Sequence, residues 1–300
     1  MKAIGIDIGG TKIETQVFDD DWQVAARARV DTPRDYPALV AAVASQVAWA
    51  EAEADAVLPV GIGSAGLVHP STGRMIAANL AANGHRFGAD LDAALGRRVT
   101  LLNDCRALAL SEAVFGAGRG ADTVAAVILG TGVSGGVIHG GALRDGPTGT
   151  GGEIGHMAAP AHLIAAYDLP IYDCGCGRRG CVETYISGPG LVRLALHIIG
   201  QDVTTRDIAA RKAGDMAQVW AVWCALVGEV LHGLVVTLDP DIIILGGGLS
   251  LIDGVAQDVQ AAAQAAQFAD ITVPPVVIAQ GGDTSGARGA AYAAWSAKHD

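Results

Sequence analysis

Two glycine-rich turns, each lying between a pair of apolar strands, constrain the fold of this chain more than any other feature. In the first pair, strands are expected over residues 3–8 and 13–18, with Gly9-Gly10-Thr11 between them. The second pair runs from Thr123 to Ile138 and turns at Gly130 to Gly136. Because this pattern occurs twice, and helix and strand patterns alternate after it, we predict an α/β protein with two duplicated lobes.

The size and composition of the chain agree with two lobes around well-buried cores. It has 300 residues, more than one compact core usually contains, and 51% of them are apolar while 17% are charged. We predict a small α/β lobe over residues 1–118 and a large α/β lobe over 119–288. A last helix, over about 289–300, is expected to pack back on the small lobe. Between the hairpins, the patterns predict a helix over 36–54 and a strand over 57–62.

The charge of the chain limits its partners. The formal net charge is −11, whereas a surface that neutralises nucleic-acid phosphates or anionic lipids needs clustered Lys and Arg. We find no run of about 18 apolar residues, the length expected of a membrane span. We therefore expect a cytoplasmic protein with no nucleic-acid and no membrane partner, in which any bound phosphate is held locally by backbone amides and a metal ion.

The glycine turns are candidate phosphate-binding sites. Glycine allows backbone amides to approach phosphate oxygens, and Asp7, at the end of the first strand, can orient a hydrated Mg²⁺. One such turn alone is more often an ordinary hairpin turn, but two in matching strand contexts favour phosphate binding. A third glycine run follows an apolar strand over 241–245 and suits the base and ribose of a nucleotide, with a loop between domains as the alternative. The residues expected to bind a nucleotide and Mg²⁺ are Asp7, Gly9, Gly10, Thr11, Lys12, Gly130, Thr131, Gly132, Gly246, Gly247 and Gly248.

A cluster of cysteines predicts a metal site. Three of the five cysteines, Cys174, Cys176 and Cys181, lie close together among glycines. With His156 they offer one imidazole and three thiolates, which is a complete tetrahedral set for a structural Zn²⁺. Buried free cysteines and a disulfide are the alternatives, and both fit this spacing less well. We therefore predict a closed zinc site formed by these four residues.

A carboxylate ends another apolar strand. Leu101-Leu102-Asn103-Asp104 precedes a helical pattern over 107–113, so Asp104 lies at the junction of a strand and a helix. A carboxylate placed there can accept the proton of an attacking hydroxyl group, as a kinase requires. From these residues alone, capping of the helix by Asn103 or Asp104 explains the pattern at least as well.

Together these motifs resemble a known family. The segments Asp7 to Lys12, Gly130 to Gly136 and Asp239 to Gly248 are similar to the two phosphate turns and the adenosine segment of the actin-like ATPase (ribonuclease H-like) fold. More narrowly, the chain resembles the ROK-family sugar kinases from Ile4 to about Ala294, most specifically in the cysteine cluster. The resemblance implies an ATP-dependent hexose kinase that binds Mg·ATP between its lobes and transfers the γ-phosphoryl group to a sugar 6-hydroxyl. It also implies a structural zinc loop that shapes the sugar pocket.

The resemblance assigns the sugar site as well. It implies that Asp104 is the catalytic base and that Asn103 binds the sugar. The residues that match sugar-contacting positions of the family are Gly66, Asn79, Asn103, Asp104, Glu153, His156 and Glu183. The stretch 77–84 and the spacer between His156 and Cys174 look closer to bacterial N-acetylglucosamine kinases than to glucokinases. N-acetyl-D-glucosamine is therefore the expected sugar, followed by fructose, glucose and mannose.

The chain departs from the family at one place, and the family offers other functions. Where these kinases usually have a small residue and Asn after the base, this chain has Cys105 and Arg106, which leaves the packing behind the base open. Repressors of the family carry a helix-turn-helix ahead of the first phosphate turn, which begins here at Asp7, so we expect an enzyme. A sugar-binding protein without transfer activity is the other alternative. Family members are often dimers or tetramers, which would place this chain in a homodimer or a homotetramer.

Overall fold

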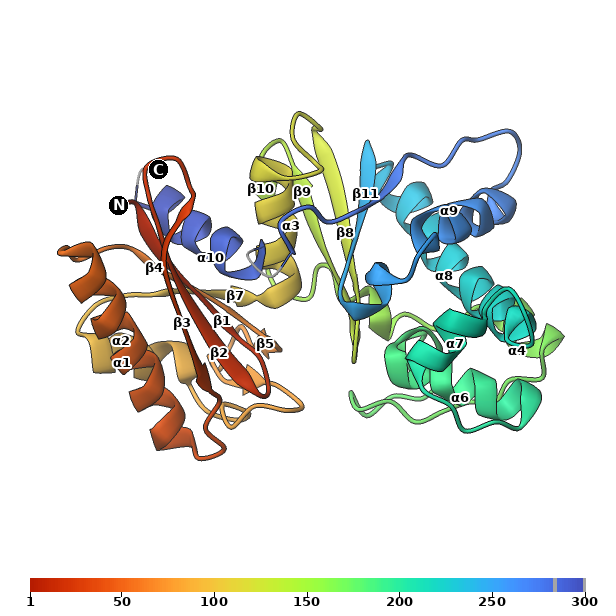
Figure 1. Ribbon diagram of the computed structural model, residues 1–300, viewed down its shortest axis with the longest axis horizontal. Helices are drawn as coiled ribbons and strands as arrows, with labels where there is room; N and C mark the ends of the chain where they lie inside the picture. The colour runs from red at the N-terminus through yellow and green to blue at the C-terminus, as the bar shows by residue number, and fades with distance from the viewer. Residues whose placement is uncertain (283–284, 299–300) are drawn as a thin grey trace.

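The computed structural model describes residues 1–282 and 285–298 and has two lobes, each built on a five-stranded sheet (Figure 1). The strand order in the small lobe is β3-β2-β1-β4-β7. These strands are β1 (Ala3–Ile8), β2 (Lys12–Phe18), β3 (Val24–Asp31), β4 (Val60–Ser64) and β7 (Thr100–Asn103). The strands β1, β2 and β3 form an antiparallel meander, whereas β4 and β7 run parallel to β1. A separate two-stranded sheet pairs β5 (Leu67–Val68) with β6 (Met75–Ile76).

The sheet of the large lobe repeats this plan. Its order is β10-β9-β8-β11-β12, with an antiparallel β8-β9-β10 meander and with β11 and β12 parallel to β8. These strands are β8 (Thr123–Leu129), β9 (Val133–His139), β10 (Ala142–Leu143), β11 (Ile242–Gly246) and β12 (Val276–Ile278). The hairpins β1–β2 and β8–β9 therefore occupy the same place in the two sheets, and the predicted duplication of the lobes is confirmed.

Helices cover both faces of the small-lobe sheet. On one face lie α1 (Tyr36–Ala54) and α2 (Phe87–Leu95), while α10 (Ser285–Ser296) packs against β1 and β4 on the other (Figure 1). The approach of α10 is so close that a Cβ atom on Gly61 would lie 1.8 Å from the carbonyl oxygen of Ala290. The helix predicted over 289–300 corresponds to α10, and residues 299–300 lie outside the described residues.

The helices of the large lobe gather on one face of its sheet. They are η1 (Ile154–His156), α4 (Ala161–Ala166), α5 (Glu183–Ile186), α6 (Gly188–Ile199), α7 (Thr205–Arg211), α8 (Ala217–Leu238), η2 (Gly248–Leu251) and α9 (Val255–Ala266). By length and composition α8 could cross a membrane, which the sequence did not suggest, but 67% of its apolar window is buried. Its residues Trp223, Leu226 and Val227 pack in the core of the lobe, so we describe α8 as a core helix.

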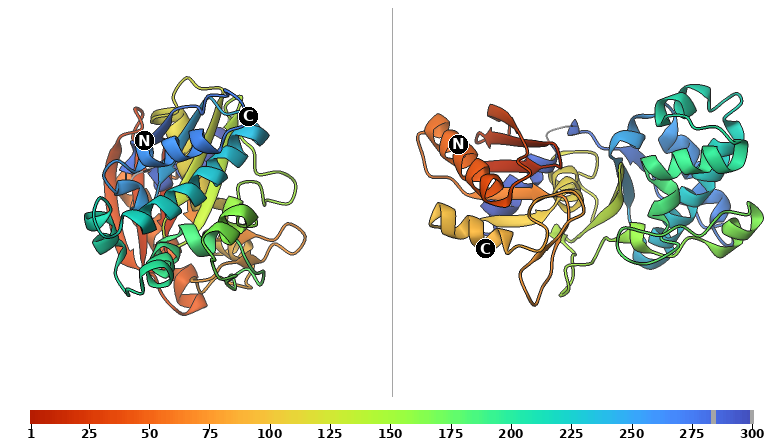
Figure 2. Two further views of the ribbon diagram at one scale, coloured as in Figure 1. Left: turned by 90° about the vertical axis from the view of Figure 1, so that its right-hand side faces the viewer. Right: turned by 90° about the horizontal axis from the view of Figure 1, so that it is seen from below.

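The helix α3 (Asp104–Phe115) lies between the two sheets and contacts strands of both (Figure 1). Figure 2 shows from below that this yellow segment joins the red and orange small lobe to the green and blue large lobe. Glu112 on α3 is fully buried. Its carboxylate accepts four hydrogen bonds at 2.7–3.1 Å, from the backbone N–H groups of Ala117, Gln280 and Gly281 and from Ser285 Oγ. One carboxylate thus ties together the two chain segments that cross between the lobes. Because α3 contacts both lobes, the limits 1–118 and 119–288 stay a prediction.

Two strand boundaries differ from those predicted. The strand expected over 57–62 is β4, which begins at Val60, because Val57 is 72% exposed in the preceding loop. The strand expected over 241–245 is β11, which begins one residue later. The carboxylate of Asp241 accepts hydrogen bonds from the backbone N–H groups of Asp122 and Thr123 at 2.8–2.9 Å, so Asp241 holds a turn ahead of the strand.

Candidate active site and metal centre

The predicted base lies where β7 enters α3. Asn103 caps the helix, because its backbone is extended (φ −67°, ψ 147°) and its Oδ1 accepts a hydrogen bond from the Cys105 N–H at 2.9 Å. Its Nδ2 donates to the carbonyl oxygen of Gly66 at 3.2 Å, which joins α3 to the loop after β4. Asp104 is the first residue of the helix and is half-buried. The capping role that the sequence left open thus belongs to Asn103, while a substrate role for either residue stays a prediction.

The surroundings of Asp104 strengthen it as a proton acceptor. Burial raises the pKa of its carboxyl group above the usual range, and the backbone N–H of Cys105 and the charge of Arg106 offset only part of this rise. A carboxylate with a raised pKa holds a proton more firmly than an exposed aspartate does. That property suits a group that must take a proton from a hydroxyl.

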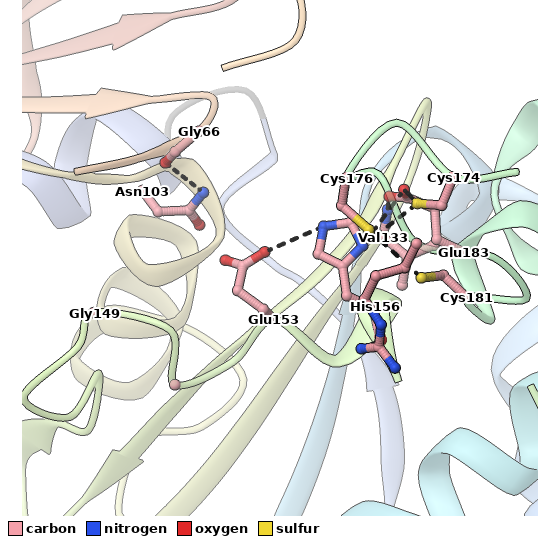
Figure 3. A network of polar contacts seen from close by, with 12 residues as sticks. Gly66, Asn103, Val133, Gly149, Glu153, His156, Cys174, Cys176, Cys181 and Glu183 are labelled. Carbon is pink, nitrogen blue, oxygen red and sulfur yellow. Dashed lines mark hydrogen bonds and ion pairs between the residues drawn. The ribbon is translucent and has the colours of Figure 1, made fainter. Parts of the chain in front are cut away.

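Four side chains converge beside the second glycine turn (Figure 3). The ligand atoms of His156, Cys174, Cys176 and Cys181 all lie within 4.8 Å of one another. Cys174 Sγ is 3.7 Å from His156 Nδ1, and the Sγ atoms of Cys176 and Cys181 are 3.6 Å apart. Zn–S bonds of about 2.3 Å and Zn–N bonds of about 2.0 Å place neighbouring tetrahedral ligands roughly 3.5–3.8 Å apart. All five cysteines of the chain are free of disulfides, so this donor set fits a zinc ion.

Tight backbone turns bring the thiols together. The N–H of Cys174 donates to the carbonyl oxygen of Arg178 at 2.8 Å, which closes a turn around Cys176. Gly177 in this turn has φ +85°, a conformation that residues with a Cβ atom rarely adopt. The side chain of Arg178 then donates to the carbonyl oxygen of His156 at 2.8 Å and so joins the cysteine turn to η1.

Two glutamates flank His156 (Figure 3). Glu183, at the start of α5, accepts a hydrogen bond from the Val133 N–H at 2.9 Å, and its other oxygen lies 3.9 Å from His156 Nδ1. Glu153 Oε2 lies 4.0 Å from His156 Nε2. Glu153 Oε1 is buried and accepts no hydrogen bond from the part of the chain that the structure describes. A buried acceptor without a donor is costly, so Glu153 is suited to receive a hydrogen bond from a ligand.

The two glycine turns are open to solvent. In the first, the Gly9 N–H donates to the carbonyl oxygen of Lys12 at 2.9 Å; in the second, the Gly130 N–H donates to that of Gly132 at 3.0 Å. The exposed residues of the two turns are Gly10, Thr11, Thr131 and Gly132. The third glycine run packs against the second turn, since a Cβ atom on Gly247 (φ +83°) would lie 2.5 Å from the carbonyl oxygen of Leu129. Asp7 lies beside the start of α10, where a Cβ atom on Gly286 would be 3.3 Å from its carboxyl carbon.

A cavity of ≈ 140 Å³ lies between the small lobe and α3. It is lined by Gly66, Leu67, Val68, Met75, Leu101, Leu102, Asn103, Arg106, Asp145 and Gly149. Figure 3 shows the pair Gly66 and Asn103 on one side of Glu153, with His156 and the cysteines on the other. Asn79 does not line this cavity: it is exposed, and its carbonyl oxygen would be 3.2 Å from a Cβ atom on Gly10, so it borders the first glycine turn, and its sugar contact stays a prediction.

Comparison with known proteins identifies the family. The model of the ROK family matches residues 3–297. The chain belongs to the ROK family. An N-acetylgalactosamine kinase of Shewanella sp. (strain ANA-3) is 40% identical to it over 292 residues, which cover 96% of this chain and 94% of that kinase. An N-acetyl-D-glucosamine kinase of Pasteurella multocida (strain Pm70) is 38% identical over 295 residues, which cover 96% of this chain and 97% of that kinase.

Solved ROK structures share the fold. A ROK hexokinase from Thermus thermophilus superimposes with a TM-score of 0.88 and 31% identity over the full length of both chains. A ROK family glucokinase from Streptomyces griseus, in complex with glucose and AMPPNP, has a TM-score of 0.79 and 29% identity, covering 97% of this chain and 98% of that one. The predicted family and two-lobed actin-like fold of this ROK protein are therefore confirmed.

One residue at the centre of the site was not predicted to function there. Arg106 lines the cavity, is 5% exposed and lies 3.6 Å from Glu153 Oε1. Its only signal in the sequence is the departure from the family pattern after Asp104. The neighbouring Cys105 is fully buried, and burial, together with the charge of Asp104, raises the pKa of its thiol to about 12, so it packs as an uncharged side chain.

Proposed function

We propose that this ROK protein is a kinase that transfers the γ-phosphoryl group of ATP to the 6-hydroxyl of N-acetyl-D-glucosamine. The relatives from Pasteurella and Shewanella support this class of substrate, since both act on N-acetylhexosamines and match nearly the whole chain. Their two sugars differ in the configuration of one hydroxyl group, so both belong in a test of specificity. Fructose, glucose and mannose remain alternative substrates.

The observation that most supports transfer is the position of Asp104 beside groups that can orient a hydroxyl. In the proposed reaction the sugar oxygen attacks the γ-phosphorus and its proton passes to Asp104. The bond from the γ-phosphorus to the oxygen it shares with the β-phosphate breaks, and ADP leaves with that electron pair. Asn103 and Gly66 lie next to the base, and Glu153 Oε1 is available to accept a hydrogen bond from another sugar hydroxyl.

The glycine segments are proposed to hold the nucleotide. The N–H groups of Gly9 and Gly130 close the two turns, so the exposed amides of Gly10 and Thr11 and of Thr131 and Gly132 would contact the phosphates. Gly246 to Gly248 would contact the base and ribose. Asp7 would hold a hydrated Mg²⁺, which neutralises charge on the β- and γ-phosphates. The exposure of both turns leaves their amides accessible to a ligand of this size.

The four metal-binding side chains are proposed to hold a structural Zn²⁺. With His156, Cys174, Cys176 and Cys181 as ligands, the coordination would be complete and would leave no open position for a substrate. Such an ion would connect η1 to the start of α5 and so fix Glu153 and Glu183 on the two sides of His156. We therefore assign it the task of shaping the sugar pocket. A cytoplasmic location and a homodimer or homotetramer remain predictions.

A coupled assay of ADP release tests the proposal. The protein is given Mg·ATP with N-acetylglucosamine, N-acetylgalactosamine, glucose, fructose, mannose or no sugar. We expect N-acetylglucosamine to give the highest kcat/KM, and Asp104→Asn to lower kcat by about 10²–10⁴. Asp55→Asn, at the exposed end of α1, is the matched control and should be unchanged. If no sugar stimulates ADP release while calorimetry detects sugar binding, the protein is a sugar-binding protein and the kinase proposal is wrong.

A further inference from the structure

Arg106 occupies a place that is unfavourable for a cation. It lies in the first turn of α3, near the positive end of the helix dipole, and its side chain is 6% exposed. Burying a guanidinium group is costly unless hydrogen bonds and an opposite charge compensate for lost hydration. The groups that contact the Arg106 side chain should therefore indicate its role in the site.

Within the described residues, the hydrogen-bond partners of the Arg106 side chain belong to one loop of the large lobe. Arg106 Nη2 donates to the carbonyl oxygens of Gly149 and Gly151 at 2.5 and 2.9 Å, and Nε lies 3.3 Å from the same Gly151 oxygen. The Nη2 atom is also 3.6 Å from Glu153 Oε1, the acceptor to which the described residues donate no hydrogen bond. The planar guanidinium directs Nη2 and Nε at the two carbonyl oxygens in a fixed fork and keeps its charge near Glu153, whereas a lysine ammonium has no fixed fork geometry.

The opposite side of the loop is fixed by β9. The Gly135 N–H donates to the carbonyl oxygen of Gly152 at 2.6 Å, and a Cβ atom on Gly152 would lie 2.3 Å from the carbonyl oxygen of Gly135. The loop is thus held between β9 and α3, and Glu153 follows it directly in the chain. Without Arg106, the loop would lose the hydrogen bonds that join it to α3 and would keep its contact with β9.

We propose that Arg106 is a positioning residue that fastens the 149–153 loop to the helix carrying Asp104, so that Glu153 and Asp104 face the same sugar. The inference rests on the proposed sugar-kinase function. A positive charge is needed there because two carboxylates turned toward one substrate repel each other. The guanidinium lies on the same helix turn as Asp104 and within 3.6 Å of Glu153, so it can offset this repulsion as well as hold the loop.

Steady-state kinetics of Arg106→Gln and Arg106→Lys test the proposal. Loss of hydrogen bonds from a charged donor should raise the KM for sugar about tenfold or more in Arg106→Gln, with the KM for ATP changed less than about threefold. Arg106→Lys should recover little, because a lysine ammonium on its flexible stem lacks the fixed fork of Nη2 and Nε that holds the carbonyl oxygens of Gly149 and Gly151. It also provides a second variant if Arg106→Gln does not fold. Arg144→Gln is the matched control, since Arg144 is an exposed arginine close to the same loop, and its sugar KM should change less than twofold.

A double-mutant cycle separates positioning from a purely structural role. If Arg106 acts through Glu153, Arg106→Gln should change the sugar KM of the Glu153→Gln variant by less than about threefold. Equal effects in both backgrounds, or an unchanged sugar KM in folded Arg106→Gln, would overturn the proposal. The same cycle can be measured by calorimetry, in which the Kd for sugar replaces its KM and no phosphoryl transfer is required. Wild-type protein that binds sugar but releases no ADP would refute the kinase function, while the calorimetric cycle would still decide the role of Arg106.

Discussion

Glu112 provides a sharp test of how the two lobes are joined. Glu112→Gln keeps the size of the side chain but replaces one acceptor oxygen with an NH₂ group. If the NH₂ group replaces Oε1, the hydroxyl of Ser285 can turn and accept a hydrogen bond from it, but the N–H of Gly281 faces a donor and loses its acceptor. If the NH₂ group replaces Oε2, the N–H groups of Ala117 and Gln280 both lose their acceptor, so this orientation is less favourable.

The expected cost follows from these contacts. One unpartnered buried N–H costs about 1–3 kcal/mol, and the remaining hydrogen bonds lose the extra strength that a charged acceptor gives. Because the variant no longer buries a charge, it avoids the cost of desolvating the carboxylate, which offsets part of the lost stability. We therefore expect Glu112→Gln to lower the free energy of unfolding by about 3 kcal/mol at pH 7.

The same contacts predict a dependence on pH. Although burial alone would raise the pKa of Glu112, the hydrogen bonds from Gln280, Ser285, Gly281 and Ala117 hold it below its ordinary value. A carboxyl group with a lowered folded-state pKa contributes stability that is complete above the unfolded-state pKa of about 4.3 and is lost as the pH falls through the folded-state pKa. The difference in stability between wild type and Glu112→Gln should therefore be constant above about pH 5 and should shrink below pH 4.

Urea unfolding followed by tryptophan fluorescence measures both effects, provided that each protein unfolds in a single transition. Glu51→Gln is the control, because Glu51 pairs with Arg97 at 26% exposure and such a pair contributes about 1 kcal/mol or less. If the free energy of unfolding of Glu112→Gln is within 1 kcal/mol of the wild-type value, the buried carboxylate does not hold together the two chain segments that cross between the lobes, and the reasoning is wrong.

Three further predictions concern the base, the metal site and the helix crossing. Because burial raises the pKa of Asp104 in the free protein, kcat/KM for the sugar should fall with decreasing pH through a value above the ordinary aspartate pKa of about 3.9, and a profile that stays flat down to pH 4 would contradict this. Removal of the metal by a chelator, or the substitution Cys176→Ser, should lower the melting temperature and the activity together, since binding of a structural zinc contributes on the order of 10 kcal/mol to folding. The site would be excluded if elemental analysis finds no zinc and the melting temperature does not change. Gly289→Ala should destabilise the protein by about 1–3 kcal/mol although alanine favours helix, because its Cβ atom would lie 1.7 Å from the carbonyl oxygen of Ala107. Thermal melting measures this loss, with Gly233→Ala in α8 as the control. A Cβ atom on Gly233 would lie 3.5 Å from the flexible methyl group of Met157, so this substitution should leave the melting temperature unchanged or raise it.

Local patterns in the sequence predicted the repeated elements of the fold but not all of their limits. The helix over 36–54 and the two hairpins follow from apolar periodicity and glycine turns, which act within a few residues. The start of α10 was missed by four residues, because Gly286 and Gly289 reduce helix propensity. In the structure these glycines allow the helix to approach Asp7 and Ala107, and this close contact between distant segments leaves no local pattern.

The candidate site divides in the same way. The cysteines could be identified as a possible metal site because three ligands lie within one turn and their chemistry is distinctive. Glu153 could be assigned only through the resemblance to the family, since an isolated glutamate is ordinarily a surface residue. The role of Arg106 could not be predicted, because its acceptors are backbone carbonyl oxygens 43 and 45 residues further along the chain. Recognition of carbonyl groups by a side chain depends on backbone geometry, which residue types do not encode directly.

The use of Arg106 also bears on how an acidic protein can bind ATP. The chain has a net charge of −11, and the guanidinium of Arg106, whose charge acts on Asp104, donates to two carbonyl oxygens and lies beside Glu153. A cation that compensates carboxylates in this way is not free to neutralise phosphate oxygens. The charge of a bound nucleotide would then fall to the amides of the glycine turns, to Lys12 and to Mg²⁺, which is consistent with local phosphate binding without a basic surface. On this argument, the buried arginine would organise the sugar side of the site, and a bound Mg²⁺ would supply the principal positive charge on the nucleotide side.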